Sequence, residues 1–321
     1  MTESTEFRGV FPIVPTPFDD DGVLDLDSQR RVLDCMIDQQ VDGLCIIANY
    51  SEQFLLSDAE RDQLMRVCLE YVAERVPVIV TCSHFSTQVV EDRCRAAADL
   101  GADMIMLMPP YHGVGLQAVE QAVFEHFERA AAAGGIPIMV QDAPLSGVHL
   151  PVSLLVRLAQ AIPLLQYFKI ETPQAAGKLR ALIAEGGDDI LGPFDGEEGI
   201  TLMADLDAGA TGTMCSALIP DLIRPVVEKH HAGDRDGAAQ CYHRILPLIN
   251  YENRQCGLRA TKTIMKEGGV IKSDFCRQPI KPLDEDTKNL LLKFAKKYDL
   301  EIKEVINSSE KPIPCLSLIH I

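Results

Sequence analysis

Short apolar runs alternate along this chain with longer stretches in which apolar residues recur every three or four positions. The first pattern is typical of strands buried in a parallel sheet, and the second is typical of amphipathic helices. Together they predict strands at residues 9–14, 43–48, 78–81, 104–108, 136–141, 165–170, 190–193 and 212–215. The helices are expected at residues 26–39, 57–72, 87–100, 116–133, 152–162, 175–185, 200–208 and 222–230.

Eight strand-helix units in unbroken succession predict an α/β fold, the TIM (β/α)8 barrel, over residues 8–232. A doubly wound sheet would have fewer strands, and no Gly-x-Gly-x-x-Gly motif follows the first strand. Further helices are expected at residues 236–250, 259–266 and 284–298, so residues 233–300 form a C-terminal helical extension. Residues 307–321 follow neither period, and we expect a disordered or artefactual tail there.

The charge balance limits the classes of partner. The chain has 30 basic and 47 acidic residues and a net charge of -17, which disfavours nucleic acid and anionic membranes. It contains no apolar run long enough to span a membrane and no signal peptide, so we expect a cytoplasmic protein. The 10 cysteines are scattered singly, and we interpret them as reduced thiols without a metal role.

The most unusual residue is Lys169, an amine at the end of the predicted sixth strand. Side chains alternate along a strand, so Lys169 and Glu171 share one face. In one interpretation Lys169 extends from the strand end and forms an ion pair with Glu171. In the other it is buried, its pKa falls, and the amine becomes a nucleophile toward a carbonyl. Barrel enzymes carry their chemistry where strands end. The polar residues at the other predicted strand ends favour the nucleophile, among them His84, Tyr111, His112, Gln141 and Gly196.

Several blocks resemble the class I aldolase superfamily of dihydrodipicolinate synthase and N-acetylneuraminate lyase. They are PIVPTPF at residues 12–18, YFK at 167–169 and GATG at 209–212. A closer likeness, in SEQF at 51–54, MVQDAP at 139–144 and KIETP at 169–173, is to the L-2-keto-3-deoxyarabonate dehydratases of that superfamily. The resemblance runs from about Arg8 to Tyr298. It implies a Schiff-base lysine on the sixth strand, here Lys169, no cofactor beyond that imine, and a homotetramer.

The departures from the superfamily pattern concern proton transfer. Gln141 stands where aldolases and synthases carry a tyrosine after strand five, and His112 replaces the second tyrosine of a pair after strand four. A glutamine cannot act as an acid or a base near neutral pH. The imine-forming lysine is kept while the relay for carbon-carbon bond cleavage is missing. This points to a different reaction of the same enamine.

We therefore hypothesise a hydro-lyase that dehydrates L-2-keto-3-deoxyarabonate to 2-ketoglutarate semialdehyde in non-phosphorylative pentose catabolism. Lys169 forms the imine and Glu171 removes a C3 proton. His112 is the catalytic candidate for protonating the leaving hydroxyl, with His84 as a second candidate, although a loop histidine is more often a surface residue. The loop Asn49, Tyr50 and Ser51 is expected to bind the substrate carboxylate. Further substrate contacts are expected from His84, Tyr111, Gln141 and Gly196.

Three alternatives remain open. The chain could be an aldolase that cleaves a 2-keto-3-deoxy acid to pyruvate and an aldehyde. It could also dehydrate the six-carbon diacid 5-keto-4-deoxyglucarate, although no arginine for a second carboxylate stands in the predicted loops. In a third alternative the barrel is a regulatory or binding module without catalysis. Product analysis and borohydride trapping on Lys169 separate these alternatives.

Overall fold

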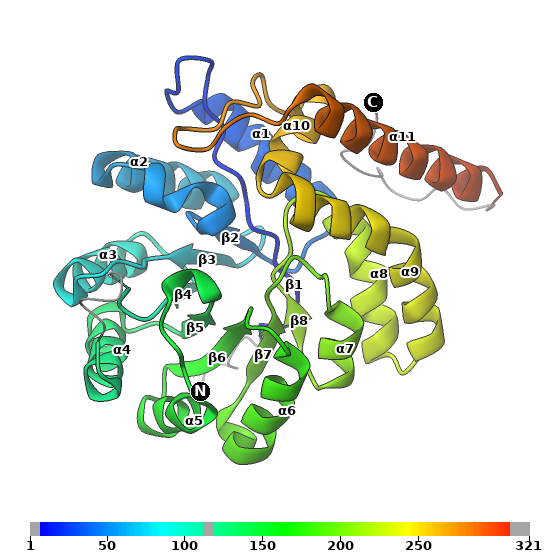
Figure 1. The fold of residues 1–321 in the computed structure, drawn as a ribbon. Helices are drawn as coiled ribbons and strands as arrows, with labels where there is room; N and C mark the ends of the chain where they lie inside the picture. The colour runs from blue at the N-terminus through cyan, green and yellow to red at the C-terminus, as the bar shows by residue number, and fades with distance from the viewer. Residues whose placement is uncertain (1–6, 112–117, 309–321) are drawn as a thin grey trace. The chain divides into compact units, whose positions relative to one another are not determined.

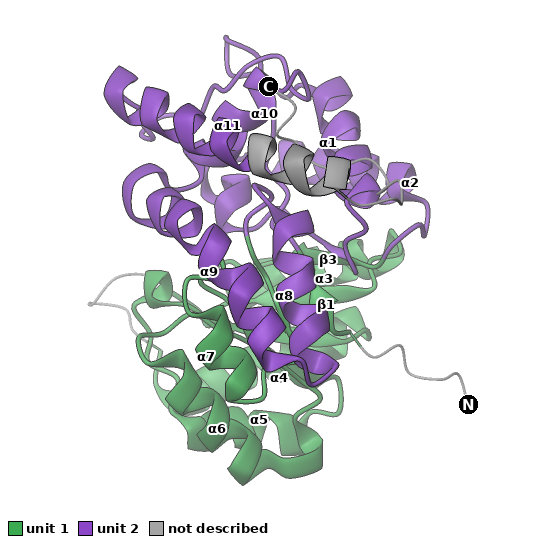
Figure 2. Cartoon of the chain, turned by 90° about the vertical axis from the view of Figure 1, so that its right-hand side faces the viewer, with its two compact units in different colours: residues 1–11, 77–215 green, residues 12–76, 216–321 purple. Residues whose placement is uncertain are grey.

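The computed structural model describes residues 7–111 and 118–308, with the elements labelled in Figure 1. The described chain divides into two compact units. Unit 1 comprises residues 1–11 and 77–215, and unit 2 comprises residues 12–76 and 216–321 (Figure 2). The tail was predicted at residues 307–321, but α11 extends to Ser308. Residues 309–321 and the loop at 112–117 lie outside the described residues.

Unit 1 holds most of the sheet. Its strands lie in the order β1-β8-β7-β6-β5-β4-β3, and each neighbouring pair is parallel. They are β1 (Gly9–Val10), β3 (Val78–Thr81), β4 (Met104–Leu107), β5 (Ile138–Asp142), β6 (Leu165–Ile170), β7 (Gly192–Asp195) and β8 (Gly212–Thr213). The intervening helices are α3 (Thr87–Asp99), α4 (Glu120–Gly134), α5 (Val152–Ala161), α6 (Ala175–Gly186) and α7 (Leu202–Asp207).

Unit 2 joins the first part of the chain to the last. Its helices are α1 (Leu26–Asp38), α2 (Asp58–Val72), α8 (Pro220–His231), α9 (Arg235–Tyr251), α10 (Arg259–Glu267) and α11 (Glu285–Ser308). The strand β2 (Leu44–Ile46) also belongs to it, and Ile13 bridges both Cys45 and Ser216 in parallel fashion. Two 3-10 turns, at Asn49–Ser51 and Gln53–Leu55, connect β2 to α2.

The predicted succession of eight strand-helix units is confirmed, and the fold is the TIM (β/α)8 barrel with a helical C-terminal extension. Ser57 and Glu60 form a capping box at the start of α2. The seventh strand was placed too early in the sequence. It runs over Gly192–Asp195 rather than 190–193, because Pro193 is tolerated inside the strand. The boundary between barrel and extension at residues 232 and 233 stays a prediction.

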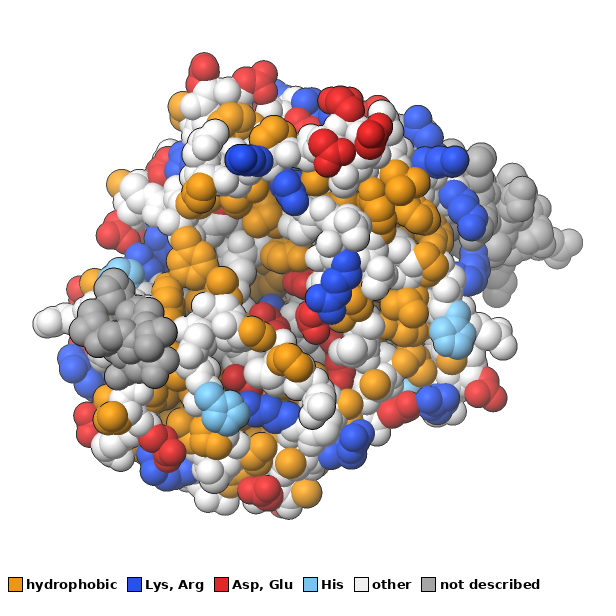
Figure 3. Space-filling model, in the orientation of Figure 1, with side chains coloured by type: hydrophobic (Ala, Val, Ile, Leu, Met, Phe, Trp, Pro, Cys, Tyr) orange, Lys and Arg blue, Asp and Glu red, His pale blue; other side chains and the backbone are white. Residues whose placement is uncertain are grey.

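The surface and the cysteines are ordinary for such a fold. On the face drawn in Figure 3, basic side chains are interspersed with acidic ones. No helix within the described ranges has the length and apolar content that crossing a membrane requires. The cysteines that the structure describes are free thiols, most of them buried.

Candidate active site

Lys169 is held on β6, a strand whose other side chains make it part of the core of unit 1. Tyr167, Phe168 and Ile170 are 5%, 0% and 0% exposed, and Lys169 itself is 3% exposed. The ring of Tyr167 packs edge-on against Phe7 with centroids 5.5 Å apart. The apolar neighbours of Lys169 therefore fix its backbone, and only the carboxyl end of the strand offers its amine a polar partner.

That partner is Glu171, which follows directly after β6. Lys169 Nζ lies 2.5 Å from Glu171 Oε1, and the Glu171 side chain is 14% exposed. Gln141 on β5 is fully buried, and its Nε2 donates to the same oxygen over 2.8 Å. The parallel register sets Gln141 beside Lys169, so the three side chains form one chain of contacts across two strands.

Two oxygen atoms in this chain of contacts remain available. Both donors to Glu171 bind Oε1, which leaves Oε2 without a hydrogen bond from the described residues. The Gln141 Oε1 atom is buried and has no hydrogen-bond partner within the described part of the chain. A buried acceptor without a donor is costly unless a ligand supplies one. The site is therefore prepared to receive donor groups.

Lys169 and Glu171 pack closely against Gly196. A Cβ atom at this position would lie 2.6 Å from Glu171 Cγ, 2.8 Å from Lys169 Cγ and 3.1 Å from the Ile170 carbonyl oxygen. None of these atoms is the free end of a flexible side chain. The predicted site residue Gly196 thus acts by lacking a side chain, and any larger residue would displace the Lys169–Glu171 pair.

Two carboxyl groups that the sequence analysis did not single out complete this part of the site. Asp195 ends β7 and Asp205 lies in α7, and both are fully buried. Thr213 Oγ1 donates to Asp195 Oδ2 over 2.5 Å, and Thr201 Oγ1 donates to Asp205 Oδ2 over 2.6 Å. Burial raises the pKa of Asp195 well above its usual value, and the neighbouring Asp205 charge adds to this, while Lys169 opposes it. A carboxyl residue directly after the apolar run 190–194 was the signal that could have identified Asp195.

A second ion pair stands at the same ends of β5 and β6. Asp142 is 2% exposed, and Lys178 Nζ contacts its Oδ2 over 2.5 Å while also donating to the Leu150 carbonyl. Burial raises the pKa of Asp142, and Lys178 opposes this rise. Both residues line a groove of about 600 Å³, and Thr172 lines it as well. The hydroxyl oxygen of Thr172 is buried and has no hydrogen-bond partner in the described ranges.

The structure shows fewer contacts for the remaining predicted site residues of unit 1. His84 follows β3, is half-buried, and its Nδ1 accepts a hydrogen bond from the Ser86 N–H over 2.9 Å. This contact places the proton of the neutral imidazole on Nε2. Tyr111 is half-buried after β4, and His112 lies outside the described residues.

The predicted carboxylate-binding loop, Asn49, Tyr50 and Ser51, belongs to unit 2. The Ser51 hydroxyl donates to the Val14 carbonyl over 2.5 Å, and Asn49 Oδ1 accepts from Gln53 Nε2 over 2.6 Å. These side chains therefore shape the loop itself.

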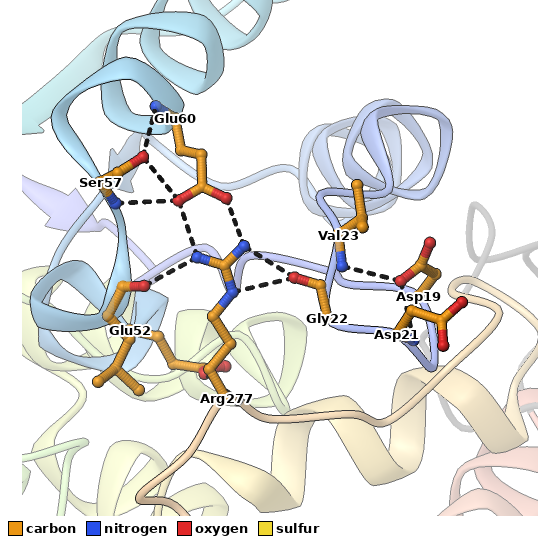
Figure 4. A network of polar contacts seen from close by, with 9 residues as sticks. Asp19, Asp21, Gly22, Val23, Glu52, Ser57, Glu60 and Arg277 are labelled. Atoms are coloured by element: carbon orange, nitrogen blue, oxygen red, sulfur yellow. Dashed lines mark hydrogen bonds and ion pairs between the residues drawn. The ribbon is translucent and has the colours of Figure 1, made fainter.

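A network of charged groups follows this loop within unit 2 (Figure 4). Arg277 donates to Glu60, to the Leu55 carbonyl and to the Gly22 carbonyl. Its backbone N–H donates to Glu52 Oε2 over 2.9 Å, and Lys262 binds Glu52 Oε1. The sequence analysis missed this network, because its members lie more than 200 residues apart in the chain.

No group of three or more His, Cys, Asp or Glu side chains placed to hold a metal ion occurs in the described residues. The arrangement in unit 1 offers a buried amine, a carboxylate with one oxygen available, and an amide with an unpaired acceptor. Such a set can form an imine with a carbonyl and move a proton at the neighbouring carbon.

Comparisons with known proteins show which proteins this chain resembles. An L-2-keto-3-deoxyarabonate dehydratase of Azospirillum brasilense is 54% identical over 301 residues, which cover 93% of this chain and 97% of that protein. A 4-hydroxy-tetrahydrodipicolinate synthase of Streptomyces coelicolor is 30% identical and covers 92% of this chain and 96% of its own length. The crystal structure of dihydrodipicolinate synthase from Rhodopseudomonas palustris matches with a TM-score of 0.82 and 26% identity, over 90% of this chain and 97% of that chain. The family model described as the dihydrodipicolinate synthetase family matches residues 6–298, so this chain belongs to that family.

Proposed function

We propose that this chain is a hydro-lyase that dehydrates L-2-keto-3-deoxyarabonate to 2-ketoglutarate semialdehyde through an imine on Lys169. The observation that carries the mechanism is the buried contact of Lys169 and Glu171, with Gln141 on the same oxygen. The dehydratase name of the Azospirillum relative, at 54% identity, supports the choice of substrate.

The first step joins the lysine to the substrate. The neutral Lys169 amine attacks the C2 ketone, and loss of water gives an iminium ion. The iminium withdraws electrons from C3, which makes the C3 protons acidic. Glu171 stands next to the amine, so it accepts the ammonium proton before the attack. It returns that proton to the carbinolamine hydroxyl as water leaves, and is then ionised again for the next step.

The second step removes a C3 proton, and Glu171 Oε2 is the base we assign to it. Its Oε1 is already occupied by Lys169 and Gln141, which fixes the orientation of the carboxylate. The resulting enamine expels the C4 hydroxyl as water once an acid protonates it. Loss of a C5 proton, reprotonation at C4 and C3, and hydrolysis of the imine then release the semialdehyde and the free lysine.

Gln141 explains why the enamine loses water instead of splitting a carbon-carbon bond. Its amide holds Glu171 by donation from Nε2 and keeps Oε1 as an unpaired acceptor. We assign this acceptor to a substrate hydroxyl. A glutamine cannot accept the C4 hydroxyl proton, which must be removed when the C3–C4 bond is cleaved.

The remaining contacts follow the same proposal. The loop Asn49, Tyr50 and Ser51 binds the C1 carboxylate, His112 protonates the leaving hydroxyl, and His84 and Tyr111 complete the pocket. The enzyme needs no cofactor besides the lysine imine, and works in the cytoplasm as a homotetramer in pentose catabolism.

The test is borohydride trapping with L-2-keto-3-deoxyarabonate, followed by peptide mass mapping and analysis of the released product. We expect an adduct on Lys169 and the semialdehyde as product. The Glu171→Gln variant should still form the adduct while turnover falls by about 10²- to 10⁴-fold, because it lacks the base but keeps the carboxamide contacts.

A matched control is the Lys178→Met variant, which removes another half-buried lysine of unit 1 and should leave the trapped adduct in place. Pyruvate as the accumulating product would replace the dehydratase by an aldolase. Absence of any adduct on Lys169 would reject catalysis through an imine.

A further inference from the structure

The two buried carboxyl groups behind Lys169 have no part in the proposed reaction. Asp195 ends β7 in parallel register with Ile170, one residue beyond Lys169, and Asp205 lies in α7. Both side chains are fully buried, and the charge of Lys169 acts on Asp195. Isolated carboxylates are rarely left in such a place, because an ionised group without compensation is costly to bury.

In both carboxyl groups, one oxygen accepts a hydrogen bond and the other does not. One oxygen of each group, Oδ2, accepts from a threonine hydroxyl: Thr213 serves Asp195, and Thr201 serves Asp205. The other oxygen of each, Oδ1, is buried and has no donor among the described residues. Strand β7 and helix α7, which carry the two groups, pack against one another, and the charge of Asp205 acts on Asp195. A single proton between the two Oδ1 atoms satisfies both, whereas two bare carboxylates would repel one another.

The surroundings decide which residue carries that proton. Besides Asp205, the charged group that faces Asp195 is Lys169 of β6, and the charged group that acts on Asp205 is Arg180 of α6. Burial raises the pKa of Asp205 as well, but the charge of Arg180 opposes this rise. Burial and the Asp205 charge raise the pKa of Asp195 well above the usual value, so Asp195 is the protonated partner.

We propose that Asp195 and Asp205 share one proton and that the neutral Asp195 is a positioning residue, which allows Lys169 to lose its own proton and attack a ketone. The inference deepens the proposed function and rests on imine formation by Lys169. An anion at position 195 would favour the ammonium form of the lysine, which is not nucleophilic. With Asp195 neutral, the amine keeps its ion pair with Glu171.

The first test needs no substrate. Infrared difference spectra at neutral pH compare the wild type with the Asp195→Asn variant. We expect the wild type to show the carbonyl band of a protonated carboxylic acid that is absent in the variant. A spectrum without that band would overturn the shared proton, and it would leave the proposed dehydration untouched.

The second test measures the rate of borohydride-trapped imine formation with L-2-keto-3-deoxyarabonate against pH in three variants. In Asp195→Asn the amide N–H replaces the shared proton, so the pH profile should match that of the wild type. In Asp205→Asn the anion that retains the proton is gone, so Asp195 ionises more readily. The rate of imine formation at neutral pH should therefore fall about tenfold or more, and its pH profile should move to higher pH. The double variant carries no charge at either position and should regain the wild-type profile.

A merely structural role predicts a different result, namely equal pH profiles in both single variants and additive losses in the double variant. That outcome would overturn the proposal. Circular dichroism of each variant shows whether the fold is kept, and the double variant gives a decision even if Asp205→Asn alone folds poorly, because restored activity at neutral pH requires the neutral pair.

Discussion

Two buried lysine-glutamate pairs, one in each unit, differ in how completely they are bonded. Lys262 and Glu52 in unit 2 have side chains that are 0% and 0% exposed. Lys262 also donates to the Phe275 carbonyl over 2.9 Å, and its amine stands 4.4 Å from the centre of the Phe18 ring. Glu52 Oε2 accepts from the Arg277 N–H. Both oxygens of Glu52 are therefore occupied.

The pair in unit 1 is left incomplete. Lys169 and Glu171 are 3% and 14% exposed, and both donors to Glu171 bind the same oxygen. The side chains of Lys169 and Glu171 pack closely against Gly196. A fully bonded pair resists change, while an incompletely bonded pair has acceptors for a reacting molecule. The difference teaches that satisfaction of hydrogen bonds, rather than burial, separates a structural lysine from a reactive one.

The largest effect is expected from Lys169→Met. Turnover should fall by roughly 10⁴-fold or more, because the covalent nucleophile is lost. The free energy of unfolding should change by less than about 2 kcal/mol, since Glu171 keeps its contact with Gln141 and part of its exposure to water. Steady-state kinetics and urea unfolding measure the two quantities. A variant that loses stability as strongly as it loses activity would contradict the comparison.

The same substitution in the other pair should have the opposite outcome. Lys262→Met leaves Glu52 as a buried carboxylate with only the Arg277 N–H as a partner, and we expect a loss of about 3 to 5 kcal/mol in unfolding free energy. Urea unfolding of the two methionine variants side by side makes the measurement. The two pairs would have to be regarded as equivalent if both variants proved equally stable.

The Gly196→Ala variant tests whether the Lys169–Glu171 pair tolerates a side chain at position 196. The added methyl group meets Glu171 Cγ at 2.6 Å, so the pair must shift, and a displacement of this size reduces turnover by about 10²-fold. The loss of stability should stay near 1 to 3 kcal/mol. Kinetics of this variant against Gly147→Ala, whose added Cβ would meet no atom within 4 Å, separates crowding from general strain. Unchanged turnover in Gly196→Ala would show that turnover does not require a glycine at position 196.

The smallest effect is expected in the stability of the unit 2 network at low pH. The Arg277 guanidinium lowers the pKa of Glu60 to about 2, against burial and together with hydrogen bonds from Ser57. A folded-state pKa below the unfolded value stabilises the fold above about pH 4.5, and this contribution is lost as the pH falls toward 2. The wild type should lose about 1 kcal/mol more than Glu60→Gln between pH 5 and 3, after allowance for solvent screening. Parallel slopes in urea unfolding would contradict this.

The sequence predicted the fold better than the site. Apolar periodicity specified the eight units, because it reports directly which segments are buried. It also placed Lys169 and Glu171 together, since they are two residues apart on one strand. It did not single out Asp195, because the link between this carboxyl and Asp205 depends on the packing of two different elements, β7 and α7. It missed the Lys262–Glu52 pair because no local pattern records a contact between residues 210 positions apart.

Arg277 has a consequence for how the protein is made. Its side chain joins the carbonyls of Gly22 and Leu55 to the Glu60 carboxylate, so segments from the first fifth of the chain depend on a residue near its end. During synthesis from the N-terminus, these segments must wait for residues 216–277 before unit 2 can close. Most of unit 1 is a continuous run, 77–215, which leaves the ribosome earlier. The order of translation thus sets the order in which the two units complete their cores.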